Sequence, residues 1–384
     1  MSTDVTTPTP RTAVGPRAFR LVIGWMLVAG ALYLRWMPTG SWNFVDLTDF
    51  FYGGVSVREG VDLYAPRPGV LAFNYPPFAG AAFVPLVLLG LPVAKVAFTA
   101  ATVIAYAVCI IAIRRAAQLS WGTALLVAAA GLALEPVVRT LVLGQIGIIL
   151  MALVLADLFL VPPRLRGVLI GIAAGIKLTP ALFVLFFVLR RDWKSAGRAA
   201  GTGLATVAVG WLASPESSRR YWLGGFDKLD RFGDLAFTPV NQSLTSFVAR
   251  TTGHSSGATL WVALGVGGAV AVASAVVLAR RGRWPAVAMT IAGATLLLSP
   301  ISWTHHWVWV VPTLGLLVAA RQFVATALVL VLFYVAPMWL VPQTGHLSAV
   351  QVVLAYAYLL GAVLLMLGVL VWHRTQRRGA DGRS

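Results

Sequence analysis

The stretch GVLIGIAAGIKLTPALFVLFFVLRR, residues 167–191, decides the fold class of this chain. It is almost wholly apolar, it ends on Arg190-Arg191, and Lys177 and Pro180 interrupt it near the middle. A helix needs about 20 mostly apolar residues to cross a bilayer, and an interior proline breaks or kinks a helix. The stretch therefore predicts a re-entrant or half-helix hairpin at membrane depth, with a charged residue at its break.

The composition of the whole chain agrees with a membrane protein. Of its 384 residues, 59% are hydrophobic and only 11% are charged, and the mean hydropathy is +0.82. Soluble domains carry about 25% charged residues. So few charges cannot cover a soluble protein of this length, which excludes a secreted domain, a disordered protein and a conventional nucleic-acid binder. The single cysteine, Cys109, excludes a disulfide framework and a cysteine-based zinc site.

Apolar runs continue along the chain on both sides of the opening stretch. They lie near residues 76–93, 95–113, 121–138, 147–162, 199–214, 257–279, 284–299, 305–320, 323–341 and 349–372. Another run, from about Leu21 to Leu34, follows a polar start and has no small-residue cleavage site behind it, so we interpret it as a retained signal anchor. The predicted fold class is an all-α polytopic membrane protein.

The basic residues predict the orientation. The net charge of +17 comes from short clusters between apolar runs, which the positive-inside rule assigns to cytoplasmic loops. The clusters are Arg114-Arg115, Arg164 with Arg166, Arg190 through Arg198, Arg280-Arg281 with Arg283, Arg321, and the tail from His373 to Arg378. If every run crossed once, the first two clusters would lie outside. Hairpins at 167–191 and at the proline-rich 74–93 bring every cluster inside.

This topology predicts about 10–12 transmembrane helices, with broken or re-entrant helices among them. We expect residues 1–20 to form a disordered cytoplasmic tail, residues 21–372 a single transmembrane domain, and residues 373–384 a basic cytoplasmic tail. Two long outer loops are expected near 38–75 and 215–256. Asp157, inside an apolar run, is expected to have a structural pairing role.

Polar candidates gather at the outer boundary of this topology. Asp46 lies among aromatic and aliphatic neighbours in the first outer loop, and desolvation there would raise its pKa and improve it as a base. Lys177 would lie at the outer tip of its hairpin, and intramembrane charges usually line functional cavities. The other candidates are Tyr75, Arg139, Gln145, Asn241, Gln242, Ser243, His305 and His306. An interfacial aromatic belt is the alternative interpretation of the histidine pair.

A base, cations and hydrogen-bonding amides thus meet on the face away from the cytoplasm, where ATP and nucleotide sugars are absent. A lipid-bound activated substrate would supply both the reactive group and a path through the membrane plane. A transporter or lipid flippase is the main alternative, because broken hairpins and a buried lysine fit it equally well. Its site, however, should lie near the midplane and be reachable from both sides. A noncatalytic scaffold is a further alternative.

A set of short motifs, in order from about residue 40 to residue 310, resembles glycosyltransferase family 87. The motifs are Asp46-Leu47 with Tyr52, Gly60-Val61-Asp62-Leu63-Tyr64, Asn74-Tyr75-Pro76-Pro77-Phe78, Gly144-Gln145, Lys177 with Pro180, Asn241-Gln242-Ser243 followed by Arg250, and Ser299-Pro300-Ile301-Ser302-Trp303-Thr304-His305-His306. Each motif is weak alone, but the set is specific. The resemblance implies the multi-span GT-C fold, an active site on the outer face of the plasma membrane and a role in actinobacterial envelope synthesis.

The resemblance also implies an activity. Members resemble α-1,2-mannosyltransferases that use a polyprenyl-phosphate-mannose donor, and the acceptor would be a mannosylated phosphatidylinositol or a related glycolipid. Membrane lipids are the other expected partners, and nucleic acid is not expected. We expect no cofactor, because no ligand cluster demands a metal, although a divalent metal is compatible with GT-C chemistry. A lipoarabinomannan-branching mannosyltransferase, or a transferase of another polyprenyl-phosphate sugar, is the alternative within enzymes.

The roles of individual residues follow from the same resemblance. Asp46 would be the general base of an inverting transfer, with His305 and His306 as the other catalytic candidates. Asp49 is the reserve for Asp46, because the family's first-loop aspartate precedes aromatic residues and this chain offers both. Donor or acceptor binding is expected of Asp49, Tyr75, Arg139, Gln145, Lys177, Asn241, Gln242, Ser243 and Arg250. The cations among them would stabilise a leaving lipid phosphate.

Overall fold

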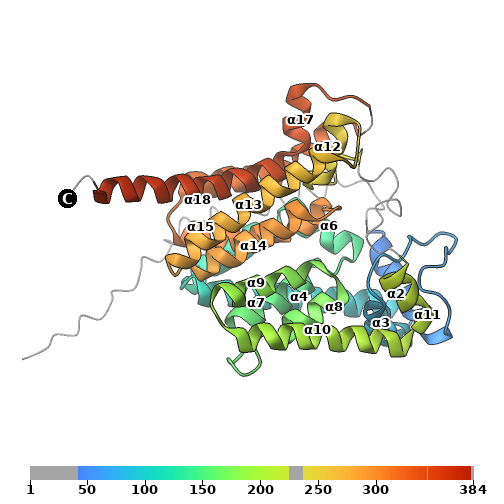
Figure 1. The fold of residues 1–384 in the computed structure, drawn as a ribbon. Helices are drawn as coiled ribbons and strands as arrows, with labels where there is room; N and C mark the ends of the chain where they lie inside the picture. The colour runs from blue at the N-terminus through green and yellow to red at the C-terminus, as the bar shows by residue number, and fades with distance from the viewer. Residues whose placement is uncertain (1–41, 225–236, 344, 382–384) are drawn as a thin grey trace, which may run out of the picture.

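The computed structural model describes residues 42–224, 237–343 and 345–381. These residues form helices joined by short turns, and no β-strand occurs among them, which confirms the all-α prediction (Figure 1). The expected N-terminal tail at 1–20 and the apolar run from Leu21 to Leu34 lie outside the described residues.

The helices are numbered as in Figure 1. They are α2 (Val45–Glu59), α3 (Pro77–Leu89), α4 (Leu91–Ala116), α5 (Trp121–Leu132), α6 (Glu135–Leu143), α7 (Gly147–Phe159), α8 (Val168–Ile176), α9 (Val184–Leu189), α10 (Trp193–Ala213), α11 (Pro215–Leu223), α12 (Leu244–Thr252), α13 (Ala258–Arg280), α14 (Trp284–Leu298), α15 (Val310–Ala319), α16 (Phe323–Val335), α17 (Ala349–Ala355) and α18 (Ala357–Asp381). Short 3-10 helices are η1 (Thr179–Phe183), η3 (Thr304–Trp309) and η4 (Pro337–Leu340).

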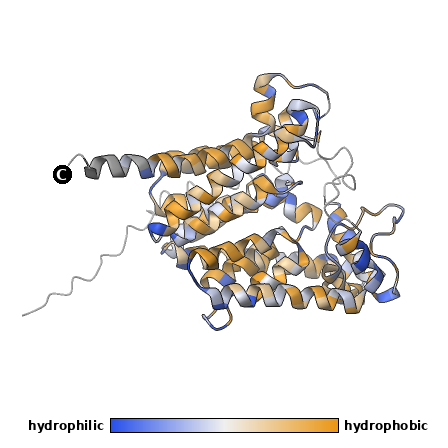
Figure 2. Ribbon diagram, viewed as in Figure 1, coloured by the Kyte–Doolittle hydropathy of each residue, from blue (hydrophilic) through white to orange (hydrophobic). Residues whose placement is uncertain are grey.

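Two of the described helices, α4 and α13, are each long and apolar enough to cross a membrane. Two bent pairs, α5 with α6 and α17 with α18, are bent by 64° and 78° and could each make one further span, for up to 4 in all. Apolar side chains on the long helices face outward: Ile104 on α4 is 65% exposed and Val262 on α13 is 64% exposed. Lipid, rather than water, suits such surfaces, and Figure 2 shows the helix bodies as mainly hydrophobic. The chain is a polytopic membrane protein, and the number of about 10–12 spans stays a prediction.

The stretch 167–191 folds as the broken pair expected from its sequence. Helix α8 ends at Ile176, Lys177 is extended (φ −146°, ψ 133°), and η1 leads into α9. Both ends of the segment lie at the start of α10: the Arg198 Nε donates to the Arg166 carbonyl oxygen at 2.8 Å, and α9 ends at Leu189, just before α10 begins. The chain therefore leaves and returns at one end of α10, and Lys177 lies at the tip of this re-entrant hairpin.

Small residues bring α8 and α10 close together. A Cβ atom on Gly171 would lie 2.7 Å from the carbonyl oxygen of Ala199, and one on Gly175 would lie 2.2 Å from the Thr206 hydroxyl. Helices in membranes commonly pack through small residues four positions apart. Asp157 accepts hydrogen bonds from the amides of Gly167 and Ile170, both at 2.7 Å, so it caps the start of α8 and has the structural role expected of it.

The prediction of a re-entrant or half-helix hairpin at residues 74–93 is wrong. Residues Pro77–Leu89 form one continuous helix, α3, and α4 starts after a single residue, Gly90, whose φ is 72°. Pro76 is the N-cap of α3 and Pro92 lies in the first turn of α4, where a helix needs no N–H donor. Pro76 and Pro92 therefore start helices here, and Pro85, which lies inside α3, does not end that helix. At 1.5 Å per residue, α3 is about 20 Å long, too short to cross a bilayer core of about 30 Å.

Helix α3 packs instead against α2, and glycine allows the close contact. A Cβ on Gly54 would lie 2.9 Å from the backbone of Phe83, and one on Gly80 would lie 2.7 Å from the Leu63 side chain. Figure 1 shows α2, α3 and α11 together at one end of the molecule, with the C-terminus of α18 at the opposite end. Both expected outer loops thus contribute helices to the same end.

Candidate active site

The candidate site is built where the start of α2 meets the end of α6. The Phe44 amide donates to the Val142 carbonyl oxygen at 3.1 Å, which joins the two segments. Gly144, the C-cap of α6, has φ 66°, and a Cβ there would lie 2.6 Å from the Leu47 Cβ. Only glycine fits both that backbone conformation and that contact. The Gly144 turn places Gln145 beside Asp46.

Asp46, Gln145 and Tyr75 form a hydrogen-bonded series. The Asp46 carboxylate is hydrogen-bonded to the Gln145 side chain. The Tyr75 hydroxyl donates to Gln145 Oε1 at 3.4 Å. Gln145 and Tyr75 are 4% and 9% exposed, so the series is almost closed to solvent. The amide of Gln145 thus links a loop tyrosine to the candidate base.

Two cations face this series from other elements. Lys177, at the tip of the α8–η1 hairpin, has its Nζ 3.0 Å from His306 Nε2 and 5.5 Å from the centre of the Tyr75 ring. Arg139, on α6, lies over the Trp339 ring at 5.0 Å. Both positive charges act on the Asp46 carboxylate. The structure therefore brings a carboxylate, an ammonium and a guanidinium together, as expected from the sequence.

The histidine pair lies on η3 at the same place. The two rings are 4.6 Å apart and nearly perpendicular, at 87°. The Trp303 amide donates to His306 Nδ1 at 3.2 Å, and the other ring nitrogen, Nε2, faces Lys177. His305 is 6% exposed, and its buried Nε2 has no hydrogen-bond partner in the described part of the chain. The structure therefore places the pair beside Lys177, and its role in catalysis stays a prediction.

Asp46 and Asp49 lie one turn apart on α2 and differ in their partners. Burial raises the pKa of Asp46 above its usual value, while the Gln145 hydrogen bond and the charges of Lys177 and Arg139 act in the opposite direction. The pKa of Asp49 is raised to about 7, first by burial and second by the negative charge of Asp46. Hydrogen-bond donors and cations stabilise an ionised carboxylate. They surround Asp46, so Asp46 is the better candidate for a carboxylate that is ready to accept a proton.

Asn241, Gln242 and Ser243 are wholly buried and hold the turn that precedes the histidines. The Gln242 amide donates to the Ser302 carbonyl oxygen at 2.7 Å, and the Ser302 amide donates to Asn241 Oδ1 at 2.8 Å. The Gln242 side chain donates to the Ala355 carbonyl oxygen, and the Ser243 hydroxyl caps α12. These side chains already have protein partners, and their role in binding stays a prediction.

Arg250 is not brought to the cluster. Its guanidinium donates to the carbonyl oxygens of Phe237 at 2.6 Å, Gln343 at 3.1 Å and Gly345 at 3.2 Å. It joins the turn before α12 to the segment before α17. The contacts described for Arg250 are structural, and its expected role in binding donor or acceptor has no support from its position.

The sequence did not identify Glu135, at the start of α6, as a residue of this region. Its carboxylate is 3% exposed and accepts hydrogen bonds from the Thr304 hydroxyl at 2.7 Å, the Trp339 indole at 3.0 Å and the Tyr358 hydroxyl at 3.2 Å. It therefore joins α6 to η3, η4 and α18. The available signal was an acidic residue inside an apolar run, just before Pro136.

Two hollows flank the tip of the hairpin. A groove of about 400 Å³ is lined almost wholly by apolar side chains, among them Pro77, Leu178, Ala181 and Val184. On the other side lies a smaller pocket of about 50 Å³, lined by Lys177, Thr179, Ser299, Ser302 and His306 among others. Residues three apart share a face of a 3-10 helix, which explains why η1 presents one side to each hollow. No group of three or more His, Cys, Asp or Glu side chains in metal-binding proximity occurs among the described residues.

Comparison with known proteins supports an enzyme. Glycosyltransferase family 87 matches residues 73–300. A Mycobacterium tuberculosis protein named polyprenol-phosphate-mannose-dependent alpha-(1-2)-phosphatidylinositol mannoside mannosyltransferase is 33% identical, over 94% of this chain and 94% of its own. A Mycolicibacterium smegmatis protein of the same name is 31% identical, over 94% of this chain and 90% of its own. A second protein of that organism, named as the pentamannoside mannosyltransferase, is 34% identical, over 80% of this chain and 78% of its own.

These similarities cover more than the individual motifs. The family match includes Tyr75, Arg139, Gln145 and Lys177, whereas Asp46 and the histidine pair lie beyond its two ends. More than half of the 384 residues match the family, and relatives at least 30% identical align along most of the chain. The chain therefore belongs to glycosyltransferase family 87 and is a membrane glycosyltransferase.

Proposed function

We propose that the protein transfers mannose from polyprenyl-phosphate-mannose to a mannosylated phosphatidylinositol, with inversion, forming an α-1,2 linkage. The names of three relatives support this donor and this class of acceptor. The single observation that carries the chemistry is the meeting of Asp46, hydrogen-bonded to Gln145, with Lys177 and His306. A buried carboxylate opposite cations suits a transfer in which a proton is removed while an anion departs.

In the proposed step, the Asp46 carboxylate takes the proton from a hydroxyl group of the acceptor mannose. The acceptor oxygen forms a bond to the anomeric carbon of the donor as the bond from that carbon to the phosphate oxygen breaks. The electron pair of the broken bond leaves with the polyprenyl phosphate. One displacement at the anomeric carbon inverts a β-linked donor to an α-linked product.

The leaving phosphate needs stabilisation of its charge rather than a proton. Lys177 Nζ and His306 Nε2 face each other at 3.0 Å at the edge of the smaller pocket. His305 has a free buried Nε2 beside them, and Arg139 adds a second positive charge. Charge-assisted hydrogen bonds to phosphate oxygens would form there, and preorganised donors of this kind commonly contribute a large part of the catalysis.

A lipid donor also needs a place for its chain. The apolar groove borders η1, and Lys177 comes directly before this helix, so an amphiphile could keep its phosphate near Lys177 and its chain against Leu178, Ala181 and Val184. We place the polyprenyl chain in this groove. An apolar groove next to the hairpin that carries Lys177 supports a lipid-linked donor over a soluble sugar nucleotide.

We place the site on the outer face of the plasma membrane, with both termini in the cytoplasm and one multi-pass transmembrane domain. Arg166, Arg190 and Arg198 lie at the base of the hairpin, opposite the tip that carries Lys177. Basic residues concentrate on the cytoplasmic side of membrane proteins. The basic residues at the hairpin base therefore support a cytoplasmic position for that base. The site at the hairpin tip would then face the outer side of the membrane.

The test is mannose transfer by purified protein in liposomes, with radiolabelled polyprenyl-phosphate-mannose and a panel of phosphatidylinositol mannosides that differ in mannose number. Wild type should extend at least one acceptor, and Asp46→Asn should lose transfer by about 10²–10⁴-fold, as expected for a general base. Asp49→Asn is the matched control. Near-normal turnover by Asp46→Asn would remove Asp46 as the base. Failure of folded wild type with every polyprenyl-phosphate sugar would overturn the function.

A further inference from the structure

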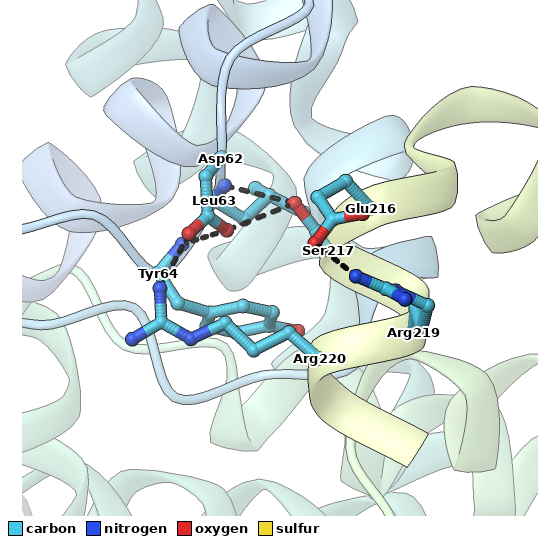
Figure 3. Close-up of polar contacts among 7 residues, drawn as sticks. All are labelled: Asp62, Leu63, Tyr64, Glu216, Ser217, Arg219 and Arg220. Carbon is cyan, nitrogen blue, oxygen red and sulfur yellow. Dashed lines mark hydrogen bonds and ion pairs between the residues drawn. The ribbon is translucent and has the colours of Figure 1, made fainter. Parts of the chain in front are cut away.

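The Gly60–Tyr64 motif joins the first outer segment to α11 (Figure 3). Asp62 accepts hydrogen bonds from the Ser217 hydroxyl at 3.1 Å and from the Tyr64 amide at 3.0 Å, and its other carboxylate oxygen accepts from Arg220. The Ser217 hydroxyl in turn accepts from the Leu63 amide at 3.0 Å. Asp62, Ser217 and Arg220 are called the outer clamp below.

The ion pair of the outer clamp is itself partly exposed, with the Arg220 and Asp62 side chains 55% and 27% exposed, but a buried serine supports it. Ser217 is wholly buried and makes two hydrogen bonds to residues more than 150 positions away in the sequence. On the exposed face of α11, by contrast, Glu216 and Arg219 pair with each other at 3.3 Å, with side chains 71% and 67% exposed. Exposed pairs of that kind contribute little. Figure 3 shows the two sets on different sides of the helix.

The outer clamp leads to the candidate site through Tyr64. The Tyr64 ring stacks on Tyr221 of α11, with centres 5.8 Å apart, and its hydroxyl donates to the Tyr75 carbonyl oxygen at 2.9 Å. The Tyr75 hydroxyl donates to Gln145 Oε1, and Gln145 is hydrogen-bonded to Asp46. Each link in this series is a hydrogen bond or a ring contact, from a loop of the outer end to the candidate base.

We propose that Asp62, Ser217 and Arg220 are positioning residues for the transfer reaction, because they hold Tyr64, and through it Tyr75, so that the Gln145 amide stays directed at Asp46. This inference rests on the proposed function, in which Asp46 is the base. The clamp residues do not contact Asp46 themselves. Since catalysis depends on sub-ångström placement of the reacting groups, a loose Tyr75 would lower turnover.

The pH–rate profile separates positioning from a merely structural role. A donor hydrogen bond from Gln145 favours the ionised form of Asp46, so its loss raises the Asp46 pKa. The other charged or titratable groups around Asp46 are Asp49 on α2, Tyr75, Arg139 on α6, Lys177 at the hairpin tip and the two histidines of η3. Substitutions in the outer clamp leave all of these groups in place. The acid limb of the profile should therefore move to higher pH.

The chain offers two matched controls. Ser218 is as deeply buried as Ser217, but its hydroxyl has no hydrogen-bond partner among the described residues. Arg219 is next to Arg220 and lies outside the outer clamp. Ser217→Ala is therefore compared with Ser218→Ala, and Arg220→Gln with Arg219→Gln. Tyr64→Phe removes the hydroxyl that binds the Tyr75 carbonyl while keeping the ring.

The experiment measures mannose transfer by each full-length variant in liposomes between pH 5 and 9, together with its thermal midpoint. Ser217→Ala, Arg220→Gln and Tyr64→Phe should lower kcat by about tenfold and raise the acid-limb pKa by about half a unit or more, with KM for the donor changed less than kcat. Ser218→Ala and Arg219→Gln should match wild type.

The outcomes distinguish this inference from the proposed function. If wild type transfers mannose and the clamp variants have the profile of their controls, the positioning role is overturned while the function stands. A lower thermal midpoint with an unchanged pH–rate profile would likewise show that the outer clamp only stabilises the fold, and it would overturn the positioning role. If folded wild type transfers no sugar from any polyprenyl phosphate, the proposed function itself fails, and the positioning role fails with it.

Discussion

Asp46 and Asp49 show how position within one helical turn separates two similar side chains. Asp49 is 6% exposed, with a pKa raised to about 7 from 3.8. A carboxyl group whose pKa is higher in the folded state binds more protons when folded than when unfolded. Stability therefore falls as pH rises from about 4 to about 7, and the loss is complete above that range. A shift of about three units corresponds to an upper limit of roughly 4 kcal/mol.

We accordingly predict that Asp49→Asn raises the thermal midpoint more at pH 8 than at pH 5. The amide keeps the shape of the carboxyl group and removes the cost of burying a charge. Thermal unfolding of wild type and variant in one detergent at both pH values is the measurement. Glu59, at the exposed end of the same helix and 57% exposed, provides Glu59→Gln as a control for a general effect of charge removal. An equal stabilisation by Asp49→Asn at both pH values would contradict the burial argument.

The histidine pair provides a second prediction at the scale of single residues. His306→Ala removes the ring nitrogen that faces Lys177, and loss of one preorganised donor costs about 10²–10³-fold in kcat. His305→Ala removes the buried Nε2 without a partner and should also lower turnover. His254, exposed in the loop after α12, provides the control His254→Ala. If both η3 variants keep wild-type turnover, the pair serves only to pack the helix.

At the scale of elements, the contact between α8 and α10 fixes where Lys177 lies. Gly171 has no room for a Cβ against the Ala199 backbone, whereas Gly201, on α10, has open space around its Cβ position. Gly171→Ala should therefore separate the two helices and destabilise the protein by about 1–3 kcal/mol. Gly201→Ala should be neutral or stabilising by up to about 1 kcal/mol, since alanine favours a helix. Thermal midpoints and transfer rates of the two variants test this, and equal stability would contradict it.

The same elements explain what could be predicted from the sequence. Lys177 and Pro180 lie inside an apolar run, so the break between α8 and η1 was visible as a local pattern. Pro76 and Pro92 look identical in sequence to helix breakers, but both lie at helix starts, and only the backbone shows the difference. The local pattern therefore predicted one hairpin correctly and the other wrongly.

The missed part of the site depends on distant partners. Glu135 is bound by Thr304, Trp339 and Tyr358, which lie 169, 204 and 223 positions away. No local pattern carries such a network. Asp46, Gln145 and Lys177 could be proposed together because a membrane topology assigns each to the same boundary. The topology thus predicted the cluster, whereas the hydrogen-bonded series through Tyr75 needed the fold.

At the scale of the whole molecule, the outer-face placement of the site rests on the direction of α10. This helix has 21 residues and is about 32 Å long, close to the thickness of a bilayer core, although Lys194 and Arg198 make it less apolar than α4 and α13. Lys194 is exposed near its first residue, at the base of the hairpin, and Arg219 is exposed on α11, just beyond its last. If α10 crosses the membrane, these two positions lie on opposite sides, and Arg219 lies on the side of the outer clamp and Asp46.

Single cysteines at the two positions test this arrangement. Cys109 is buried, and Cys109→Ala gives a background without other thiols. In intact cells, a membrane-impermeant maleimide should label R219C and leave K194C unlabelled, and permeabilised cells should show both labelled. Since impermeant reagents report only the outer side, the reverse pattern would place Asp46 and Lys177 in the cytoplasm. A site there would have access to soluble sugar nucleotides. The location of the site would then no longer support a lipid-phosphate donor.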